Sequence, residues 1–212
     1  MNFEEAVKGS SVVQEEHKET LVSNLRKIPD FSWLTGLPHQ SFDRLQGDFF
    51  SSFPIVYLRP NGGVLQNRKT VMVINNTCDL PPGRNTMVTV APVFDLEKFL
   101  ILQTGKRTPD ALADYERDVR HNQICELLYV PHLQDFPNGA IIRLDRMCSV
   151  ASDFLESAVQ NGSRIASFTQ NGFYVLLMKL TYHLTRTESS EVTRNFVSSP
   201  PPPTASPSSS WP

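Results

Sequence analysis

The chain has 212 residues, of which 40% are apolar and 20% charged, and its formal net charge is −2. This composition excludes a wholly disordered or disulfide-dense protein, and the near-neutral charge removes the basic balance typical of non-specific nucleic-acid binding. No basic stretch followed by an apolar run opens the chain, and no apolar run approaches the ~20 residues of a membrane span. We therefore expect a cytoplasmic protein that does not contact a membrane.

Residues 1–46 are expected to form a helical N-terminal segment. An apolar stripe at helical spacing, with charged residues on another face, carries this prediction. Pro29 is expected to end the helix. A short second element is expected at 41–45, with Ser41 as its cap. The residues of the stripe are Val13, Leu21, Leu25 and Ile28.

From Gly47 to about Val150 the pattern changes to short runs typical of β-strands, separated by turn signals. Pro54 interrupts the first run, which suits an edge strand or a bulge. Residues 95–102 fit a helix or a strand equally well. The expected strands are 49–58, 71–74, 87–93, 124–130 and 140–144.

Helices are expected after this region and once within it. Thr108 and Pro109 open a predicted helix that runs to about His121. A short helix is plausible at 153–159, and Thr169 can cap a longer one with a clear apolar stripe. That stripe consists of Phe173, Leu176, Leu177, Leu180 and Leu184.

Residues 187–212 are expected to be a disordered tail, because six of the sixteen prolines fall in the last thirteen residues. Pro200 to Pro203 are also compatible with a polyproline II ligand for an SH3- or WW-type partner. We favour the plain tail, since no flanking P-x-x-P with a basic anchor is present. The folded domain is then expected to span residues 47–186.

Three segments of the middle region carry a family resemblance. They are Gly47-Asp48, Arg68-Lys69-Thr70-Val71-Met72-Val73-Ile74 and Thr89-Val90-Ala91-Pro92-Val93. This layout resembles the PemK/MazF-like small β-barrel, an SH3-like fold. More closely, Thr77-Cys78-Asp79-Leu80 is similar to a T-C-D-L signature of uncharacterised bacterial and phage proteins, whose closing helix resembles residues 171–186. That resemblance implies a bacterial or phage origin and no known activity.

The ribonuclease site of the MazF type carries over poorly. Arg68 matches the arginine before the apolar strand, but Lys69 stands where that family usually has proline. After Pro92 there is no threonine or serine in the expected position. An RNA-cleaving site needs a proton-transfer group as well as a cation, and only the cation, Arg68, is in register.

Cys78 is the most distinctive candidate for chemistry. At a strand exit it is a candidate thiolate nucleophile with Asp79, if one of His121, His132 or His183 activates it. The alternative, which we favour, is that Cys78 fills the core, Thr77 belongs to the strand and Asp79 bonds the backbone of the next turn. All three cysteines, at 78, 125 and 148, are expected to be buried or half-buried thiols.

Binding candidates are few. His183 and Arg186 lie three apart on one helix face, where they either anchor an anion or interact with the helix dipole. Arg84, with Arg59, Arg68 and Lys69, falls in or beside the predicted turns, which suits single-stranded nucleic acid near Tyr57. However, residues 47–150 carry eleven basic and eleven acidic side chains, so bulk charge does not favour it. No metal or cofactor motif is present.

The sequence thus predicts an α+β protein: a helical N-terminal segment, a small, partly open β-barrel with an inserted helix, and C-terminal helices. The expected function is a non-catalytic interaction module that uses the barrel surface around Arg68 and Thr77-Cys78-Asp79, with a protein as partner. Two alternatives remain. One is a divergent toxin-like endoribonuclease or cysteine-dependent hydrolase, and the other is single-stranded nucleic-acid binding without cleavage.

Overall fold

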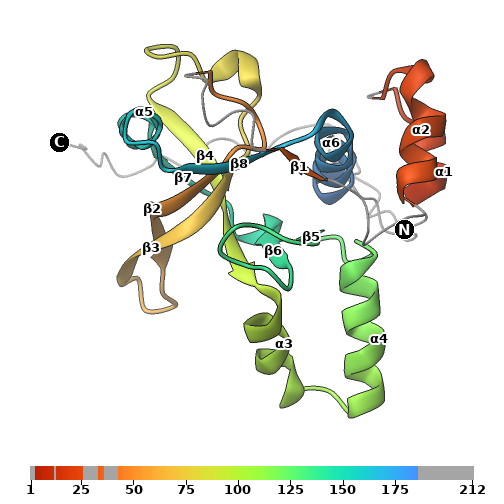
Figure 1. Cartoon of the computed structure of the whole chain (residues 1–212). Helices are drawn as coiled ribbons and strands as arrows, with labels where there is room; N and C mark the ends of the chain where they lie inside the picture. Colours follow the sequence, from red (N-terminus) through yellow and green to blue (C-terminus); the bar gives the residue numbers. More distant parts are fainter. Residues whose placement is uncertain (1–2, 12, 26–32, 36–42, 186–212) are drawn as a thin grey trace, which may run out of the picture.

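The computed structural model describes residues 3–11, 13–25, 33–35 and 43–185. They form an α+β protein in which an antiparallel sheet curls into a half-barrel, with helices at the N-terminus and a C-terminal helix (Figure 1). None of the described helices is long and apolar enough to cross a membrane. The expected tail, residues 187–212, lies outside the described residues.

The sheet has eight strands, and all its pairings are antiparallel. The strands are β1 (Leu34–Thr35), β2 (Phe49–Leu58), β3 (Val64–Val73), β4 (Met87–Asp95), β5 (Leu127–Val130), β6 (Ala140–Arg143), β7 (Cys148–Ala151) and β8 (Arg164–Phe168). Their order is β1-β8-β2-β3-β4-β6-β5, and β7 pairs with β4 off this path.

Strand β4 makes the sheet curl. Its first half, from Met87 to Val90, pairs with β7, whereas its last residues, from Val93 to Asp95, pair with β6. Because the two partners take different stretches of β4, the sheet divides there, and the described residues form three separate buried clusters. A β-bulge also bends β2 where the register shifts between Phe50 and Phe53, and Ser52 there has a φ of +50°.

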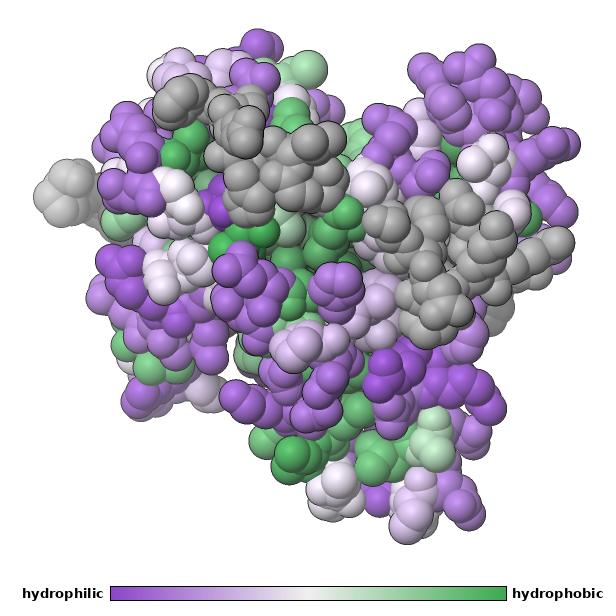
Figure 2. Space-filling view, in the orientation of Figure 1, coloured by the Kyte–Doolittle hydropathy of each residue, from purple (hydrophilic) through white to green (hydrophobic). Residues whose placement is uncertain are grey.

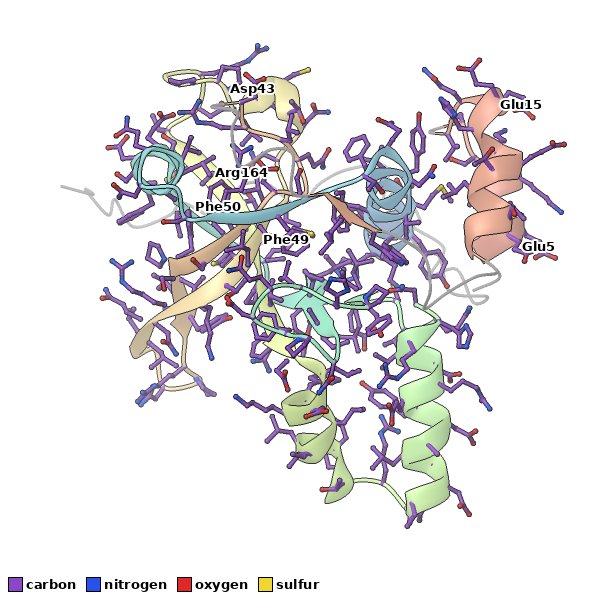
Figure 3. All side chains as sticks on the ribbon, in the orientation of Figure 1. Glu5, Glu15, Asp43, Phe49, Phe50 and Arg164 are labelled. Atoms are coloured by element: carbon purple, nitrogen blue, oxygen red, sulfur yellow. The ribbon has the colours of Figure 1, made fainter. Side chains whose placement is uncertain are left out.

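Helices cover the sheet and its rims. At the N-terminus α1 (Phe3–Gly9) and α2 (Glu15–Leu25) pack beside the closing helix, and Figure 3 shows Glu5 and Glu15 on this pair of helices. Helices α3 and α4 form a hairpin that projects from the end of β4. The remaining bounds are α3 (Leu96–Thr104), α4 (Pro109–Arg120), α5 (Ser152–Gln160) and α6 (Gln170–Thr185).

Two adjacent phenylalanines of β2 pack into different hydrophobic cores, because successive side chains of a strand point to opposite faces. Phe49 belongs to the larger core, which joins the sheet to α6 and the N-terminal helices. Phe50 belongs to the interior of the half-barrel, which α5 closes with Leu155, Ala158 and Val159. Both rings are fully buried (Figure 3).

The surface is mostly hydrophilic, but exposed apolar side chains occur at several places among the described residues, one of them the α3–α4 hairpin. Figure 2 shows hydrophilic side chains over the N-terminal helices and apolar ones toward the free end of the hairpin. In α3, Ile101 and Leu102 are 66% and 68% exposed. This hairpin therefore carries apolar surface away from the sheet.

Most expected elements are present, and the differences have physical reasons. Residues 95–102, which fitted either type, belong to the helix α3, whose cap is the side chain of Asp95. The N-terminal segment forms two helices and not one, with the expected end at Pro29 outside the described residues. Of the expected element at 41–45, only 43–45 are described, and they are neither helix nor strand.

Candidate functional site

A cleft of about 480 Å³ opens between the bulged end of the β2–β3 hairpin, the end of β4 and the first turns of α3. We call it the Arg68 cleft. Its cationic side chains are Arg68, Lys69 and Lys98, and its carboxylates are Asp95 and Asp135. It is lined by residues 51–52, 68–70, 93–95, 98–99, 102 and 135–136.

Arg68 is fixed in this cleft by the bulge of β2. Its Nη1 donates a hydrogen bond of 2.8 Å to the carbonyl oxygen of Ser52. Ser52 holds a left-handed backbone conformation that non-glycine residues seldom adopt, and this turns its carbonyl toward β3. Arg68 remains exposed, so the rest of its guanidinium fork is left to bind an anionic group.

The other charged groups of the cleft come from β3, β4 and α3. Lys69 Nζ lies 5.7 Å from the centre of the Phe94 ring, which places a cation over an aromatic face. Asp95 Oδ1 accepts a hydrogen bond of 2.9 Å from the backbone N–H of Lys98 and so caps α3. One of the two carboxylates is therefore engaged by the fold, while three cations face the cleft.

Thr77, Cys78 and Asp79 form a short 3₁₀ helix (Thr77–Asp79) after β3. The expectation that Cys78 fills the core and that Thr77 belongs to the strand is wrong, because Cys78 is exposed and Thr77 begins this helix. The backbone N–H of Cys78 donates to Asn76 Oδ1 at 3.0 Å. Asn76, rather than the expected Asp79, thus supplies the side chain that stabilises the turn.

The structure brings some predicted site residues together and separates others. Asp79 Oδ1 lies 4.0 Å from Arg84 Nε, both groups being about half exposed, so these two residues share the turn with Cys78. Arg68 lies in the middle of β3, five positions before its last residue, Val73, which corresponds to about 16 Å of strand. Neither Cys78 nor Asp79 lines the Arg68 cleft.

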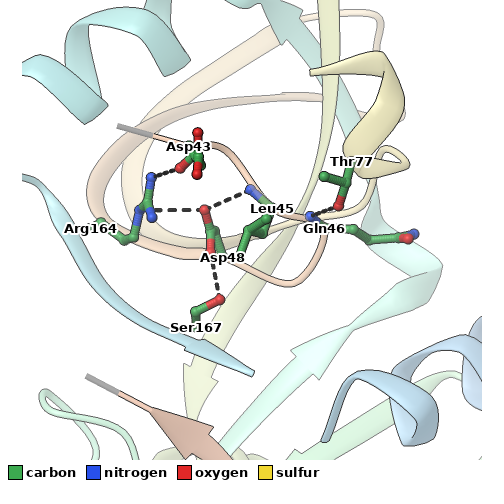
Figure 4. Close-up of polar contacts among 7 residues, drawn as sticks. All are labelled: Asp43, Leu45, Gln46, Asp48, Thr77, Arg164 and Ser167. Carbon is green, nitrogen blue, oxygen red and sulfur yellow. Dashed lines mark hydrogen bonds and ion pairs between the residues drawn. The ribbon is translucent and has the colours of Figure 1, made fainter. Parts of the chain in front are cut away.

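A buried polar cluster joins the start of β2 to β8 (Figure 4). Asp48 accepts hydrogen bonds from Ser167 Oγ at 2.6 Å and from the backbone N–H of Leu45 at 2.9 Å. Arg164 Nε lies 3.3 Å from the same carboxylate, and its guanidinium also donates to the carbonyl of Asp43. Burial raises the pKa of Asp48, against the lowering effects of these hydrogen bonds and of the Arg164 charge.

The same loop reaches the Thr77 turn. The backbone N–H of Gln46 donates to Thr77 Oγ1 at 3.0 Å, and Gln46 Nε2 donates to the carbonyl of Ile74 at 2.7 Å. The Gly47-Asp48 pair therefore immediately precedes β2, and the neighbouring Gln46 is hydrogen-bonded to the segment that follows β3. This role is structural, and the buried charges are not offered to a ligand.

His183 lies on α6, and its imidazole faces another cysteine than the one proposed from the sequence. Its Nδ1 is 3.7 Å from Sγ of Cys125, which is buried. His121 and His132 are exposed. Arg186, the expected companion of His183, lies outside the described residues. The pairing of Cys125 with His183 carries no sequence signal, because fifty-eight positions separate the two residues.

Among the residues that the structure describes, no group of three or more histidine, cysteine, aspartate or glutamate side chains is placed to hold a metal ion. Neither the protein-family models nor the curated proteins include a match to this chain.

Proposed function

We propose that this chain is a non-catalytic binding module and that the Arg68 cleft holds an acidic segment of a partner protein. One observation carries the proposal: Arg68, Lys69 and Lys98, from two different elements, line one cleft of about 480 Å³. Clustered cations that face a cleft attract carboxylates and orient them, and arginine can bind a carboxylate in a bidentate manner.

The chemistry of the cleft favours binding over catalysis. No histidine or cysteine is among its described lining residues, and Asp95 is held as a helix cap. We also propose that the half-barrel is of the SH3-like PemK/MazF type. The departures at Lys69 and after Pro92 then mean that this chain keeps the cation of that site without its proton-transfer group.

The test is binding of a fluorescein-labelled peptide rich in aspartate and glutamate, followed by fluorescence anisotropy, with an asparagine/glutamine peptide of the same length as the uncharged comparison. We expect Arg68→Glu and Lys98→Glu each to weaken binding of the acidic peptide. Lys106→Glu is the matched control, because Lys106 is exposed and outside the cleft. Equal losses from all three variants would mean that net charge alone drives binding, and the proposal would be wrong.

The same variants discriminate the two alternatives. If a single-stranded RNA or DNA probe binds more tightly than the acidic peptide, with an affinity that falls steeply with salt, the partner is a nucleic acid. If RNA is cleaved and Arg68→Glu abolishes the cleavage, the chain is an enzyme. Either result overturns the proposed function.

A further inference from the structure

The loop between α4 and β5 places a thiol against the closing helix. Cys125 Sγ lies 3.7 Å from His183 Nδ1, within hydrogen-bond range for sulfur. Cys125 is buried, with 8% of its surface exposed. Neither residue lines the Arg68 cleft, so the inference drawn from this pair is independent of the proposed function.

Hydrogen bonds hold the loop that carries Cys125. Lys179, one helical turn before His183 and fully buried, donates from Nζ to the carbonyl oxygens of Asn122 and Ile124, both at 2.6 Å. Asn122 in turn exchanges hydrogen bonds with the backbone of Tyr129, accepting from its N–H at 2.7 Å and donating to its carbonyl at 3.2 Å. The position of the sulfur relative to His183 is therefore fixed from both sides.

Two nitrogen-bearing side chains of α6, His183 and Lys179, lie beside the loop that carries the sulfur. Burial lowers the pKa of Lys179 to about 7, while the negative charges of Cys125 and Glu126 act in the opposite direction. An imidazole within hydrogen-bond reach can accept the thiol proton, and the thiolate is the reactive nucleophile.

We propose that Cys125 and His183 form a thiol–imidazole pair that makes Cys125 the site at which this chain reacts with hydrogen peroxide. His183 Nδ1 takes the thiol proton while the sulfur attacks one peroxide oxygen. The S–O bond forms as the O–O bond breaks, and the departing hydroxide takes the proton from His183 and leaves as water. The sulfur is oxidised to a sulfenic acid, and the peroxide is reduced.

The three thiols of the one chain allow an internal comparison, because Cys78 is exposed and Cys148 is half-buried. The full chain is treated with hydrogen peroxide at pH 7, the sulfenic acids are trapped with dimedone, and each cysteine peptide is quantified by mass spectrometry. Exposure alone would make Cys78 react first. We expect Cys125 to react faster than Cys78, and the reverse order would overturn the proposal.

Substitution of His183 tests whether its imidazole acts as a base in the oxidation of Cys125 or only covers the sulfur. We expect His183→Gln to slow dimedone labelling at Cys125 on the order of tenfold or more, since a general base contributes at least that much. Labelling at Cys78 should not change. His121→Gln is the control, because His121 is exposed and adjoins the same loop. Unchanged or faster labelling of Cys125 in His183→Gln would show that the imidazole only covers the sulfur. The comparison of Cys125 with Cys78 uses the unsubstituted chain, so it does not depend on whether this variant folds.

Discussion

Arg164 Nε lies 3.3 Å from Asp48 Oδ2, and the two side chains keep only 4% and 1% of their surface exposed. Asp48 precedes β2 and Arg164 begins β8, so this ion pair joins the entry of one strand to the entry of its neighbour. Two buried charges are tolerated when each satisfies the other and further hydrogen bonds complete their shells. Ser167, Leu45 and Asp43 supply those bonds.

Removing one of the two charges should strongly lower the free energy of unfolding. We expect Asp48→Asn to lower the free energy of unfolding by about 3–5 kcal/mol, because it leaves the positive charge of Arg164 buried without its carboxylate counter-ion. Urea denaturation followed by circular dichroism measures the change. Asp114→Asn is the matched control, since Asp114 pairs with Arg117 at 3.0 Å on the exposed surface of α4 and should contribute at most about 1 kcal/mol. Equal losses from the two variants would contradict the assignment of Asp48 as a buried anchor.

Lys179 should make stability depend on pH. Its pKa is lowered by burial to about 7, whereas in the unfolded chain it returns to its ordinary value of 10.5. Between these values the unfolded chain binds more protons than the folded one, so the free energy of unfolding rises with pH from about 7 to about 10. Below pH 7 both states are protonated and the contribution stays at its unfavourable minimum.

We expect the Lys179→Met variant to lack this rise. The measurement is the urea midpoint at several pH values from 6.5 to 10, which reports the change in stability as long as the denaturant slope stays constant. The profiles of the unsubstituted chain and of the variant are compared so that other titrating groups cancel. Lys106→Met serves as the exposed control and should keep the rise. Parallel pH profiles for Lys179→Met and the unsubstituted chain would mean that the buried ammonium stays charged throughout.

Local patterns in the sequence are sufficient to predict the position of most strands of the half-barrel. Strand β2 has the bounds expected from its apolar run, and Thr169 caps α6 as its position suggested, accepting a hydrogen bond from the backbone N–H of Gly172 at 3.2 Å. Strand β3 begins earlier than its apolar run, because residues 64–68 are exposed and pair with β2 without contributing to a core. Strands β1, β7 and β8 are not among the expected strands, because each is short and lacks a clear apolar alternation.

The arrangement of the candidate sites could not be predicted in the same way. Arg68 was identified from its place before an apolar strand, but its cleft depends on Lys98 of α3, a segment that fitted either helix or strand. A long-range ion pair such as Asp48 with Arg164 has no local sequence pattern, because the sequence does not distinguish a buried charged residue from an exposed one. Cys125 and His183 meet only because α6 returns across the loop before β5.

Gly172 is needed where α6 meets β1. A Cβ at this position would lie 2.5 Å from the backbone carbonyl oxygen of Trp33, which cannot move as a side chain tip can. The same carbonyl accepts the backbone N–H of Thr169 at 2.8 Å, so it is fixed by the helix start itself. We expect Gly172→Ala to lower the free energy of unfolding by about 2 kcal/mol or more.

The control for Gly172→Ala is Gly105→Ala. A Cβ at Gly105 meets nothing within 4 Å, and its φ of −74° suits alanine. This variant should be neutral or more stable by up to about 1 kcal/mol, because alanine restricts the unfolded chain. Urea denaturation measures both variants. A neutral Gly172→Ala would mean that α6 does not sit against β1 at the distance seen here.

At the Thr77–Asp79 turn, Asn76 and Cys78 should contribute differently to stability. Because Cys78 is exposed, we expect Cys78→Ala to change the free energy of unfolding by no more than about 0.5 kcal/mol. Asn76→Ala should lower it by about 1 kcal/mol, because the variant loses the acceptor for the backbone N–H of Cys78. Chemical denaturation of the two variants side by side measures both effects. A loss of 2 kcal/mol or more in Cys78→Ala would return the sulfur to the core, as the sequence pattern had suggested, and would remove it from the accessible thiols.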